Sequence, residues 1–334
     1  MTRRSAGRLV LVAAALGACG PYGELAQRLD VTARIAGDTW IAAVGPGRAE
    51  LRVLIVATPD ARGTAPFAFT SMPGPSALTL QGTWTEVGAG GDVTLRVAHT
   101  YTLLDESGRA PLNRVGAQRD DSGRTLHVTV TREAGRLVVA GDPLLAGTYA
   151  GLTESLARLG TATEHDAACA YQVASLAVES SEVRIIGFGG PGMLQYQRPQ
   201  SYVGTVAGSV RVSMSGFLQN TTRIEYAGFS DQGGVTLTGP QVTDADSGGD
   251  GHMSGVVAFS LAPSSSDPSA AVTAITGRID YGGAGNPADA VRISSGNPAG
   301  GFYVTSLDGG ATARVPATAV TAPSPSLADC LGLP

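Results

Sequence analysis

Lysine is absent from this chain of 334 residues, and charged side chains of any kind are few. The 23 basic residues are all arginine, and 28 acidic residues outnumber them, so the formal net charge is −5. Proteins that bind nucleic acids gather basic residues to neutralise phosphates. An acidic chain without basic clusters therefore argues against DNA or RNA as a partner.

Long hydrophobic runs and aromatic residues are also scarce. A transmembrane helix needs about 20 consecutive apolar residues, and no stretch of the sequence approaches that length. Aromatic residues make up 5% of the chain, whereas it contains 46 glycines and 19 prolines. This composition is typical of a protein built from many short strands and turns.

The common catalytic motifs are missing from the sequence. It has no G-x-S-x-G nucleophile turn, no H-E-x-x-H zinc motif and no phosphate-binding P-loop. Gly187, Gly189 and Gly192 do spell G-x-G-x-x-G after the strand-like stretch Val183–Ile186. A dinucleotide loop needs a helix directly after it, but Pro199 follows here. We therefore predict a glycine-rich bend and no cofactor.

The first residues of the chain have the pattern of a leader. Three arginines precede the apolar segment Leu9–Leu16, which is too short to span a bilayer and fits the core of a signal peptide. The next residues, Leu16-Gly17-Ala18-Cys19, resemble the lipobox of bacterial lipoproteins. The alternative is an ordinary cleaved signal peptide that contains a cysteine.

The resemblance to lipoproteins implies a fatty-acylated protein. Residues 1–18 would be the signal peptide, Cys19 would carry the lipid, and residues 19–23 would be the anchor and linker. Gly20 follows the cysteine in place of Asp, and in this family that implies the outer membrane. The expected location is thus the bacterial cell envelope, with the membrane as a partner through the lipid.

The two remaining cysteines form an even pair. In an exported protein such a pair indicates a disulfide, here between Cys169 and Cys330. The alternative is two separate thiols. No Cys or His has the spacing of a zinc site.

Residues 24–142 are expected to form an N-terminal β domain of sandwich or barrel type. Its clearest strand is Val93–Leu103, in which apolar and polar residues alternate. The expected inward face of this strand consists of Val93, Leu95, Val97, His99, Tyr101 and Leu103.

The segment Gly82-Thr83-Trp84, with the hairpins that follow it to Val139, is similar to small lipocalin-like barrels. The resemblance implies a carrier of an apolar small molecule, with a ligand pocket under Trp84, His99 and Tyr101. His99 could serve as a base at a barrel mouth, but a core histidine with satisfied hydrogen bonds is the preferred interpretation.

Residues 143–180 are expected to form a helical or irregular connection. Gly151–Leu159 has leucines on one side of a short helix, and Ala167–Val178 could be a helix or a buried strand, with the helix favoured. Thr163 and Asp166 have the spacing of a capping box, which predicts a helix start between them.

Residues 181–316 are expected to form a C-terminal β-meander domain, followed by a proline-rich tail over residues 317–334. The run Thr222–Asp231 with the glycine-rich strand after it resembles hairpins of uncharacterised β-rich bacterial envelope lipoproteins. Asp244, Asp246 and Asp250 form the one group with metal-like spacing, but a calcium loop would need further oxygen ligands. We predict a solvated hairpin loop and no metal.

These observations predict a mostly β protein with two antiparallel domains and a short helical connection. The expected role is that of a membrane-anchored envelope lipoprotein with a structural, adhesive or ligand-binding function and no enzymatic activity. A lipocalin-like carrier is the alternative. An envelope hydrolase is a lesser alternative, because no catalytic triad can be assigned. The expected partner is an envelope protein or a small apolar ligand.

Overall fold

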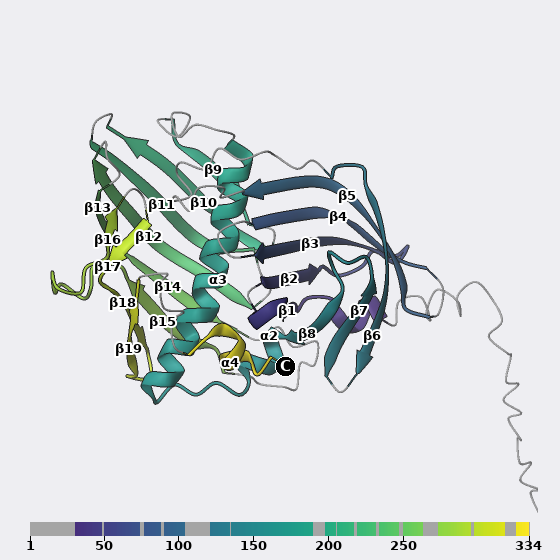
Figure 1. Ribbon diagram of the computed structural model, residues 1–334. Coiled ribbons are helices and arrows are strands. Elements are labelled where there is room, and N and C mark those ends of the chain that lie inside the picture. Colours follow the sequence, from purple (N-terminus) through teal and green to yellow (C-terminus); the bar gives the residue numbers. More distant parts are fainter. Residues whose placement is uncertain are drawn as a thin grey trace, which may run out of the picture.

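The computed structural model of this chain is mostly β, with a closed barrel beside a second, open sheet and one long helix between them (Figure 1). It describes residues 31–48, 50–73, 77–87, 90–103, 121–133, 135–189, 198–204, 206–216, 219–231, 234–246, 250–262, 273–294, 297–317 and 325–333. Both sheets are antiparallel throughout their described pairs. The predicted fold class is therefore confirmed.

The barrel is closed by eight antiparallel strands in sequence order. Trp40 and Ile41 of the first strand pair with Gly151 and Ala150 of the last, which joins the two edges. A closed barrel leaves no strand edge unpaired. The strands are β1 (Thr39–Val44), β2 (Glu50–Val56), β3 (Thr64–Pro73), β4 (Ala77–Glu86), β5 (Asp92–Leu103), β6 (Thr125–Glu133), β7 (Arg136–Gly141) and β8 (Gly147–Gly151); the short 3-10 helix η1 (Pro46–Arg48) follows β1.

Alternation of residue type decides which side chains enter the barrel. In β6, Leu126, Val128 and Val130 are buried, while Thr125 and His127 are exposed. The strand period of two places apolar side chains inside and polar ones outside. β2 departs from this pattern because both of its faces are covered: Leu54 packs inside the barrel, and Val53 packs outside it against the rest of the protein.

A β-bulge in β5 interrupts the alternation that the sequence suggests. The ladder pairs Gln81 with His99 but Gly82 with Val97, so Ala98 is an extra residue. An extra residue moves every later side chain to the opposite face. His99 is therefore exposed and does not belong to the core, which corrects the predicted inward face.

The second sheet has eleven strands that follow residue 200. Its outer strands branch from β12, which pairs with β13 over one half of its length and with β14 over the other. The strands are β9 (Gln200–Val203), β10 (Ala207–Ser215), β11 (Gln219–Ser230), β12 (Val235–Asp246), β13 (Gly251–Ser254), β14 (Val256–Leu261), β15 (Ile275–Asp280), β16 (Arg292–Ser294), β17 (Asn297–Gly300), β18 (Phe302–Leu307) and β19 (Thr312–Pro316).

The long helix α3 (Glu164–Gly189) lies between the barrel and the second sheet (Figure 1). From Ala167 to Val178 its residues are buried, apart from half-buried Ser175. A helix that is apolar on all sides is a core helix. This explains why periodicity alone could not distinguish a helix from a buried strand over Ala167–Val178. The helix is confirmed, and it continues through Val183–Ile186, where the sequence suggested a strand.

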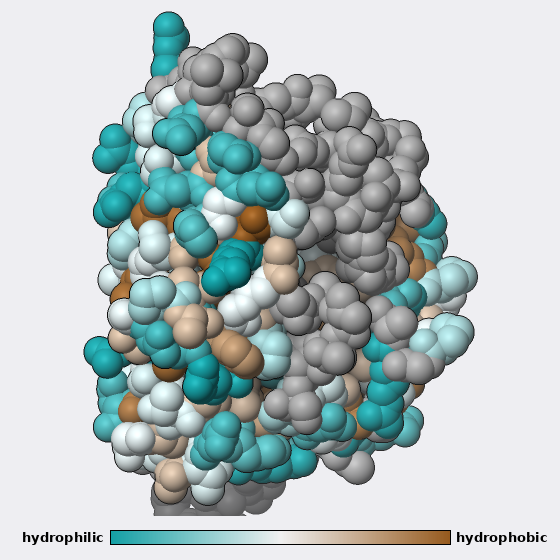
Figure 2. All heavy atoms as spheres, turned by 60° about the vertical axis from the view of Figure 1, so that its left-hand side comes forward, coloured by the Kyte–Doolittle hydropathy of each residue, from teal (hydrophilic) through white to brown (hydrophobic). Residues whose placement is uncertain are grey.

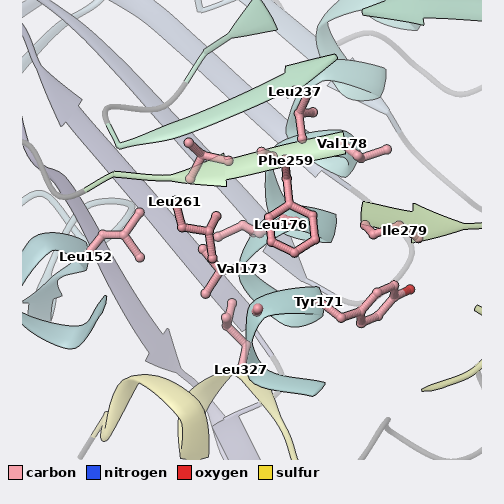
Figure 3. Close-up of a cluster of buried hydrophobic side chains, with 14 of the residues drawn as sticks. Leu152, Tyr171, Val173, Leu176, Val178, Leu237, Phe259, Leu261, Ile279 and Leu327 are labelled. Atoms are coloured by element: carbon pink, nitrogen blue, oxygen red, sulfur yellow. The ribbon is translucent and has the colours of Figure 1, made fainter. Parts of the chain in front are cut away.

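One apolar cluster joins α3 to its neighbours on both sides. Val173 and Leu176 of α3 pack near Phe259 and Leu261 of the second sheet (Figure 3). The same cluster includes Ile41 and other side chains from the outer face of the barrel. Burial of apolar area is the main favourable contribution to folding. The barrel, α3 and the second sheet therefore share one continuous core, separate from the core inside the barrel.

Two further short helices belong to the described structure, and the N-termini of α3 and α4 are capped. Thr163 and Asp166 form the predicted capping box, because the Asp166 N–H donates to Thr163 Oγ1 and the Thr163 N–H donates to Asp166 Oδ2. The other helices are α2 (Leu152–Leu156) and α4 (Leu327–Leu331). The sequence suggested domain boundaries after residues 142 and 180. The first lies between β7 and β8, and the second lies inside α3.

Candidate functional site

The interior of a barrel is where a ligand pocket would be expected, and here large apolar side chains occupy it. The side chains of Trp40, Trp84, Phe69 and Tyr149 are at most 2% exposed and belong to one apolar cluster. An eight-stranded barrel is just wide enough for such side chains to occupy its centre. The described residues therefore place a large apolar core inside the barrel.

Helical residues 31–35 close one end of the barrel, which we call the helix end. Thr32 donates to Glu86 Oε2 through its backbone N–H (3.2 Å) and its hydroxyl (3.0 Å). The Trp84 indole N–H donates to the same Thr32 hydroxyl at 3.1 Å. The Trp40 indole donates to the Ile35 carbonyl. Buried polar groups need such partners, so these bonds hold the helical residues across the barrel end.

The opposite end, which we call the Arg52 end, is closed by a charged side chain. Arg52 points into the barrel and donates to the carbonyl oxygens of Pro143 (3.1 Å) and Ala146 (2.7 Å). Its guanidinium also pairs with Glu50, which accepts a hydrogen bond from Ser71. Burial by itself would raise the pKa of Glu50, but the bonds from Arg52 and Ser71 outweigh it and lower the pKa. The turn before β8 is thereby fixed across this end.

Tyr149 supports the Arg52 end from inside the barrel. Its side chain is fully buried, and its hydroxyl donates to the Leu145 carbonyl at 2.6 Å. Burial raises the pKa of the Tyr149 hydroxyl, and the nearby Arg52 charge opposes that shift only in part. A hydroxyl that is held protonated and already bonded serves packing and positioning rather than proton transfer.

The structure places Trp84 and His99 on different sides of the barrel wall. Trp84 fills the barrel core, and His99 lies on the outer surface beyond the bulge. Tyr101 pairs with Thr79 in the ladder, and its side chain lies outside the described residues. The bulge separates His99 from Trp84 because the extra residue after Val97 turns the His99 side chain to the outer face. Trp84 and His99 therefore lie on opposite sides of the barrel wall, whereas a role for Tyr101 in a ligand pocket stays a prediction.

A shallow hollow of about 350 Å³ lies on the outer surface of β5 and β6. Its polar lining consists of Asp92, Thr94, His127 and Thr129, and Val87 lies at its edge. His127 Nδ1 is 3.4 Å from Thr94 Oγ1, whereas Thr129 Oγ1 donates to Asp92 Oδ1 at 2.9 Å. These groups can form hydrogen bonds with a polar molecule that lies on this surface.

The same hollow lacks the geometry of nucleophilic catalysis. A hydroxyl nucleophile needs a base within hydrogen-bond reach and a third group that orients the base. His127 is near Thr94, but Asp92 is bonded to Thr129 and so does not orient the histidine. The arrangement suits weak polar contacts better than acyl transfer.

The aspartates Asp244, Asp246 and Asp250 lie at the β12–β13 turn. Asp244 accepts a hydrogen bond from the Thr221 hydroxyl, and Asp246 accepts one from the Asp250 backbone N–H. In the part of the chain that the structure describes, no three His, Cys, Asp or Glu side chains are arranged to hold a metal ion. The Asp244 and Asp246 carboxylates therefore accept hydrogen bonds from described groups of the sheet, and residues 247–249 between β12 and β13 lie outside the described residues.

The two predicted disulfide cysteines do meet. Cys169 of α3 and Cys330 of α4 are bonded, with Cα atoms 5.3 Å apart. Cys19 lies outside the described residues, so its predicted lipidation stays a prediction. Within the described ranges, no helix is both long and apolar enough to cross a membrane.

Comparison with protein-family models, with curated proteins and with solved structures finds no match to this chain. Its function must therefore be argued from its own residues. Sequence reasoning missed both closures of the barrel. The sequence alone offered no reason to single out Thr32, Glu86 and Arg52, and the helical conformation of residues 31–35 is known only from the structure. The available signal was positional, because Glu86 and Arg52 continue the inward alternation of otherwise apolar strands.

Proposed function

We propose that this protein is a lipid-anchored component of a bacterial cell envelope, with a non-enzymatic structural, adhesive or ligand-binding role. The leader and the lipobox at Cys19 support the anchor and the outer membrane as its place. The bonded pair Cys169–Cys330 supports an oxidising compartment outside the cytoplasm. The acidic, lysine-free composition supports an envelope protein rather than nucleic acid as the partner.

The apolar core of the barrel is the observation that supports a structural or adhesive role over that of a carrier. Trp40, Trp84 and Phe69 are buried inside the barrel, and hydrogen bonds hold the segments that cover its two ends. Such a barrel acts as a rigid body. Rigid bodies of this kind suit scaffolding or display, whereas carriers need an interior volume. The hollow at His127 supports weak polar binding at the surface.

The outer face of the second sheet supports a role in contact with another envelope component. Figure 2 shows the side of the molecule that carries this sheet, where hydrophilic side chains predominate and hydrophobic ones are scattered. Cross-strand neighbours on this face include Thr236 with Ser260, and Arg278 with Ser306. Short hydroxyl side chains with interspersed arginines are suited to a wet, polar contact.

Replacement of the lipidation residue tests the proposal. In cells that express the full chain, Cys19→Ala should abolish incorporation of a fatty-acid analogue and should move the protein from the membrane to the soluble envelope fraction. Cys169→Ala is the matched control, because it removes a cysteine that lies in α3 and should leave labelling intact. If the unaltered chain takes up no fatty acid, the anchor proposal is wrong.

A second measurement separates the scaffold from the lipocalin-like carrier. The mature protein should not increase the fluorescence of an apolar probe such as a naphthalene sulfonate or a fluorescent fatty acid, because its barrel is filled. Saturable binding with a one-to-one stoichiometry would favour the carrier. The probe should be tested on the non-acylated Cys19→Ala chain, so that the protein's own lipid does not compete.

A further inference from the structure

The hollow on the outer surface of β5 and β6 contains a carboxylate without a basic partner. Asp92 lines the hollow and is exposed. Its Oδ1 accepts a hydrogen bond from the Thr129 hydroxyl at 2.9 Å, and among the described residues it forms no ion pair. Asp121 and Asp142, by contrast, both pair with Arg124. The Thr129 bond orients the Asp92 carboxylate and leaves its Oδ2 to accept a bond from a ligand.

The arginine on the same face of β5 is too far away to balance this charge. Arg96 follows Asp92 by four positions, which corresponds to about 13 Å along a strand. That separation exceeds the Debye length of about 8 Å at physiological ionic strength. Arg96 is also not among the residues that line the hollow. The charge of the hollow therefore favours a ligand with a positively charged group.

His127 and Thr94 supply hydrogen-bonding groups beside the carboxylate. They lie on the same face as Asp92, because the ladder pairs Thr94 with His127 and Asp92 with Thr129. Thr94 Oγ1 is 3.4 Å from His127 Nδ1. A neutral imidazole has one donor and one acceptor nitrogen, so Nε2 takes the role that Nδ1 does not. The hollow therefore offers hydrogen bonds to hydroxyl groups next to the place of the positive charge.

Val87 and Gly141 give the hollow an apolar edge and room for a ring. The Val87 side chain is 53% exposed at the edge of the hollow. Gly141 has a φ of +108°, and a Cβ there would lie 2.7 Å from the His127 carbonyl oxygen, so the position requires glycine. The volume of about 350 Å³ lies within the range of small-molecule sites, about 300–1,000 Å³. The hollow therefore accommodates a molecule of the size of a monosaccharide.

We propose that this hollow binds an amino sugar through its primary ammonium group. The ammonium group donates to Asp92, the ring hydroxyls form hydrogen bonds with His127 and Thr94, and the CH groups of the ring contact Val87. This inference rests on the ligand-binding part of the proposed function, whose site and ligand class it names. An open hollow with one exposed ion pair binds weakly. Selectivity for the charged amine is therefore the property that decides the proposal.

The histidine signals in NMR spectra of the full chain test this binding, because the chain has only four histidines. The non-acylated Cys19→Ala chain is labelled with ¹³C in its imidazole rings, and the signal of His127 is assigned with His127→Gln. Glucosamine is then added at a pH at which its amine is charged. We expect a saturable shift of the His127 signal, whereas the signals of His99, His165 and His252 should not move. A His127 signal that does not respond would overturn the proposal.

N-acetylglucosamine and Asp92→Asn isolate the effect of the charge. N-acetylglucosamine keeps the ring and its hydroxyls but replaces the ammonium group by a neutral amide. It should bind about three- to fivefold more weakly than glucosamine, the range expected for loss of an exposed ion pair. In Asp92→Asn the two sugars should bind equally, whereas the control Glu133→Gln, an exposed carboxylate of β6 outside the hollow, should keep the preference. A preference that persists in Asp92→Asn would contradict the proposal, because it would arise from the acetyl group.

Ethanolamine tests whether the sugar ring contributes to binding. It has the ammonium group and a single hydroxyl, so it retains the bond to Asp92 but loses most contacts with His127, Thr94 and Val87. We expect several-fold weaker binding than that of glucosamine in the same titration. Equal affinities would show that the hollow recognises the ammonium group alone, and would refute the assignment to an amino sugar.

These experiments separate failure of this inference from failure of the proposed function. Fatty-acid incorporation reports the anchor and does not depend on the hollow. If the unaltered chain is acylated but glucosamine leaves the His127 signal in place, the amino-sugar site is refuted and the anchored envelope protein stands. If glucosamine binds at His127 but the unaltered chain is never acylated, the anchor alone is refuted.

Discussion

Thr32 donates both its backbone N–H and its hydroxyl to the same carboxylate oxygen of Glu86, 54 positions away in the sequence. The threonine hydroxyl also accepts the indole N–H of Trp84, so one side chain links the helical residues 31–35 to the end of β4. All three side chains are buried. The helix end of the barrel therefore depends on a small polar network rather than on apolar contact alone.

Removal of this hydroxyl should destabilise the protein. Thr32→Val keeps the shape of the side chain but leaves the Trp84 N–H and the Glu86 carboxylate short of a partner. Buried groups that lose a partner cost about 1–3 kcal/mol each, so we expect a loss of that order in the free energy of unfolding, measured by urea denaturation. The control Thr131→Val alters an exposed residue of β6 and should change stability by less than about 0.5 kcal/mol. Equal effects of the two substitutions would contradict the network.

The Arg52 end should respond to loss of its guanidinium. Arg52→Met leaves Glu50 and the carbonyls of Pro143 and Ala146 without their donor. A fully buried pair broken in this way loses about 3–5 kcal/mol, and the loss here should be smaller, because the Glu50 side chain is 22% exposed. The double variant Arg52→Met/Glu50→Gln should recover part of the loss in thermal unfolding. No recovery would show that the carboxylate does not depend on Arg52.

The exposed pair Arg223–Glu225 provides a matched control for that experiment. Both of its side chains are at least 40% exposed, and the pair lies on the second sheet. Exposed ion pairs contribute about 0–1 kcal/mol. Arg223→Met should therefore change the unfolding temperature much less than Arg52→Met does.

The bulge in β5 predicts a large effect of a substitution at Gly82 and a small effect of one at His99. A Cβ on Gly82 would lie 1.9 Å from the Arg96 carbonyl oxygen, so Gly82→Ala should destabilise the barrel by about 1–3 kcal/mol. His99→Ala changes an exposed residue and should have little effect. Gly300→Ala, where a Cβ meets nothing within 4 Å, is the control. The free energy of unfolding is measured by denaturant unfolding. A large decrease in it for His99→Ala would show that the histidine belongs to the core.

The disulfide should stabilise the whole protein, because Cys169 and Cys330 are 161 positions apart and join two helices of the shared core. Closing so long a loop lowers the entropy of the unfolded chain, for which typical contributions are about 2–5 kcal/mol. Reduction should lower the unfolding temperature of the native chain. Cys169→Ala/Cys330→Ala should match the reduced protein and should not respond to reductant. Reactive thiols in the unreduced mature protein would argue against the bond.

Asp38 should make stability fall as the pH rises. Burial raises the pKa of this carboxyl, although hydrogen bonds from Thr153 and Thr39 and the charge of Arg132 oppose the shift. The folded state then binds more protons than the unfolded state between the ordinary pKa and the raised one, so stability decreases with pH across that window. Asp38→Asn lacks this dependence. Its free energy of unfolding relative to that of the native chain should increase as the pH rises above the ordinary pKa of 3.8, measured by chemical denaturation at several pH values.

The sequence by itself determined the secondary structure at several places with a clear local pattern, although Val183–Ile186, which resembled a strand, belongs to α3. The alternation in Thr125–Glu133 and the capping box of Thr163 and Asp166 depend only on neighbours along the chain, and both appear in the structure. The even pair of cysteines was sufficient to predict the bond between α3 and the C-terminal segment. The mostly antiparallel β class followed from the many short alternating runs.

Only the tertiary structure decided how these elements combine. Closure of the barrel depends on β1 meeting β8, more than a hundred residues later, and no local pattern encodes that pairing. The side of His99 was reversed by one extra residue, whose position depends on the close approach of Gly82 to β5. Ala167–Val178 became a central helix because apolar surfaces cover it on both sides. Thr32, Glu86 and Arg52 acquired their roles because folding removes them from water next to partners that are distant in the sequence.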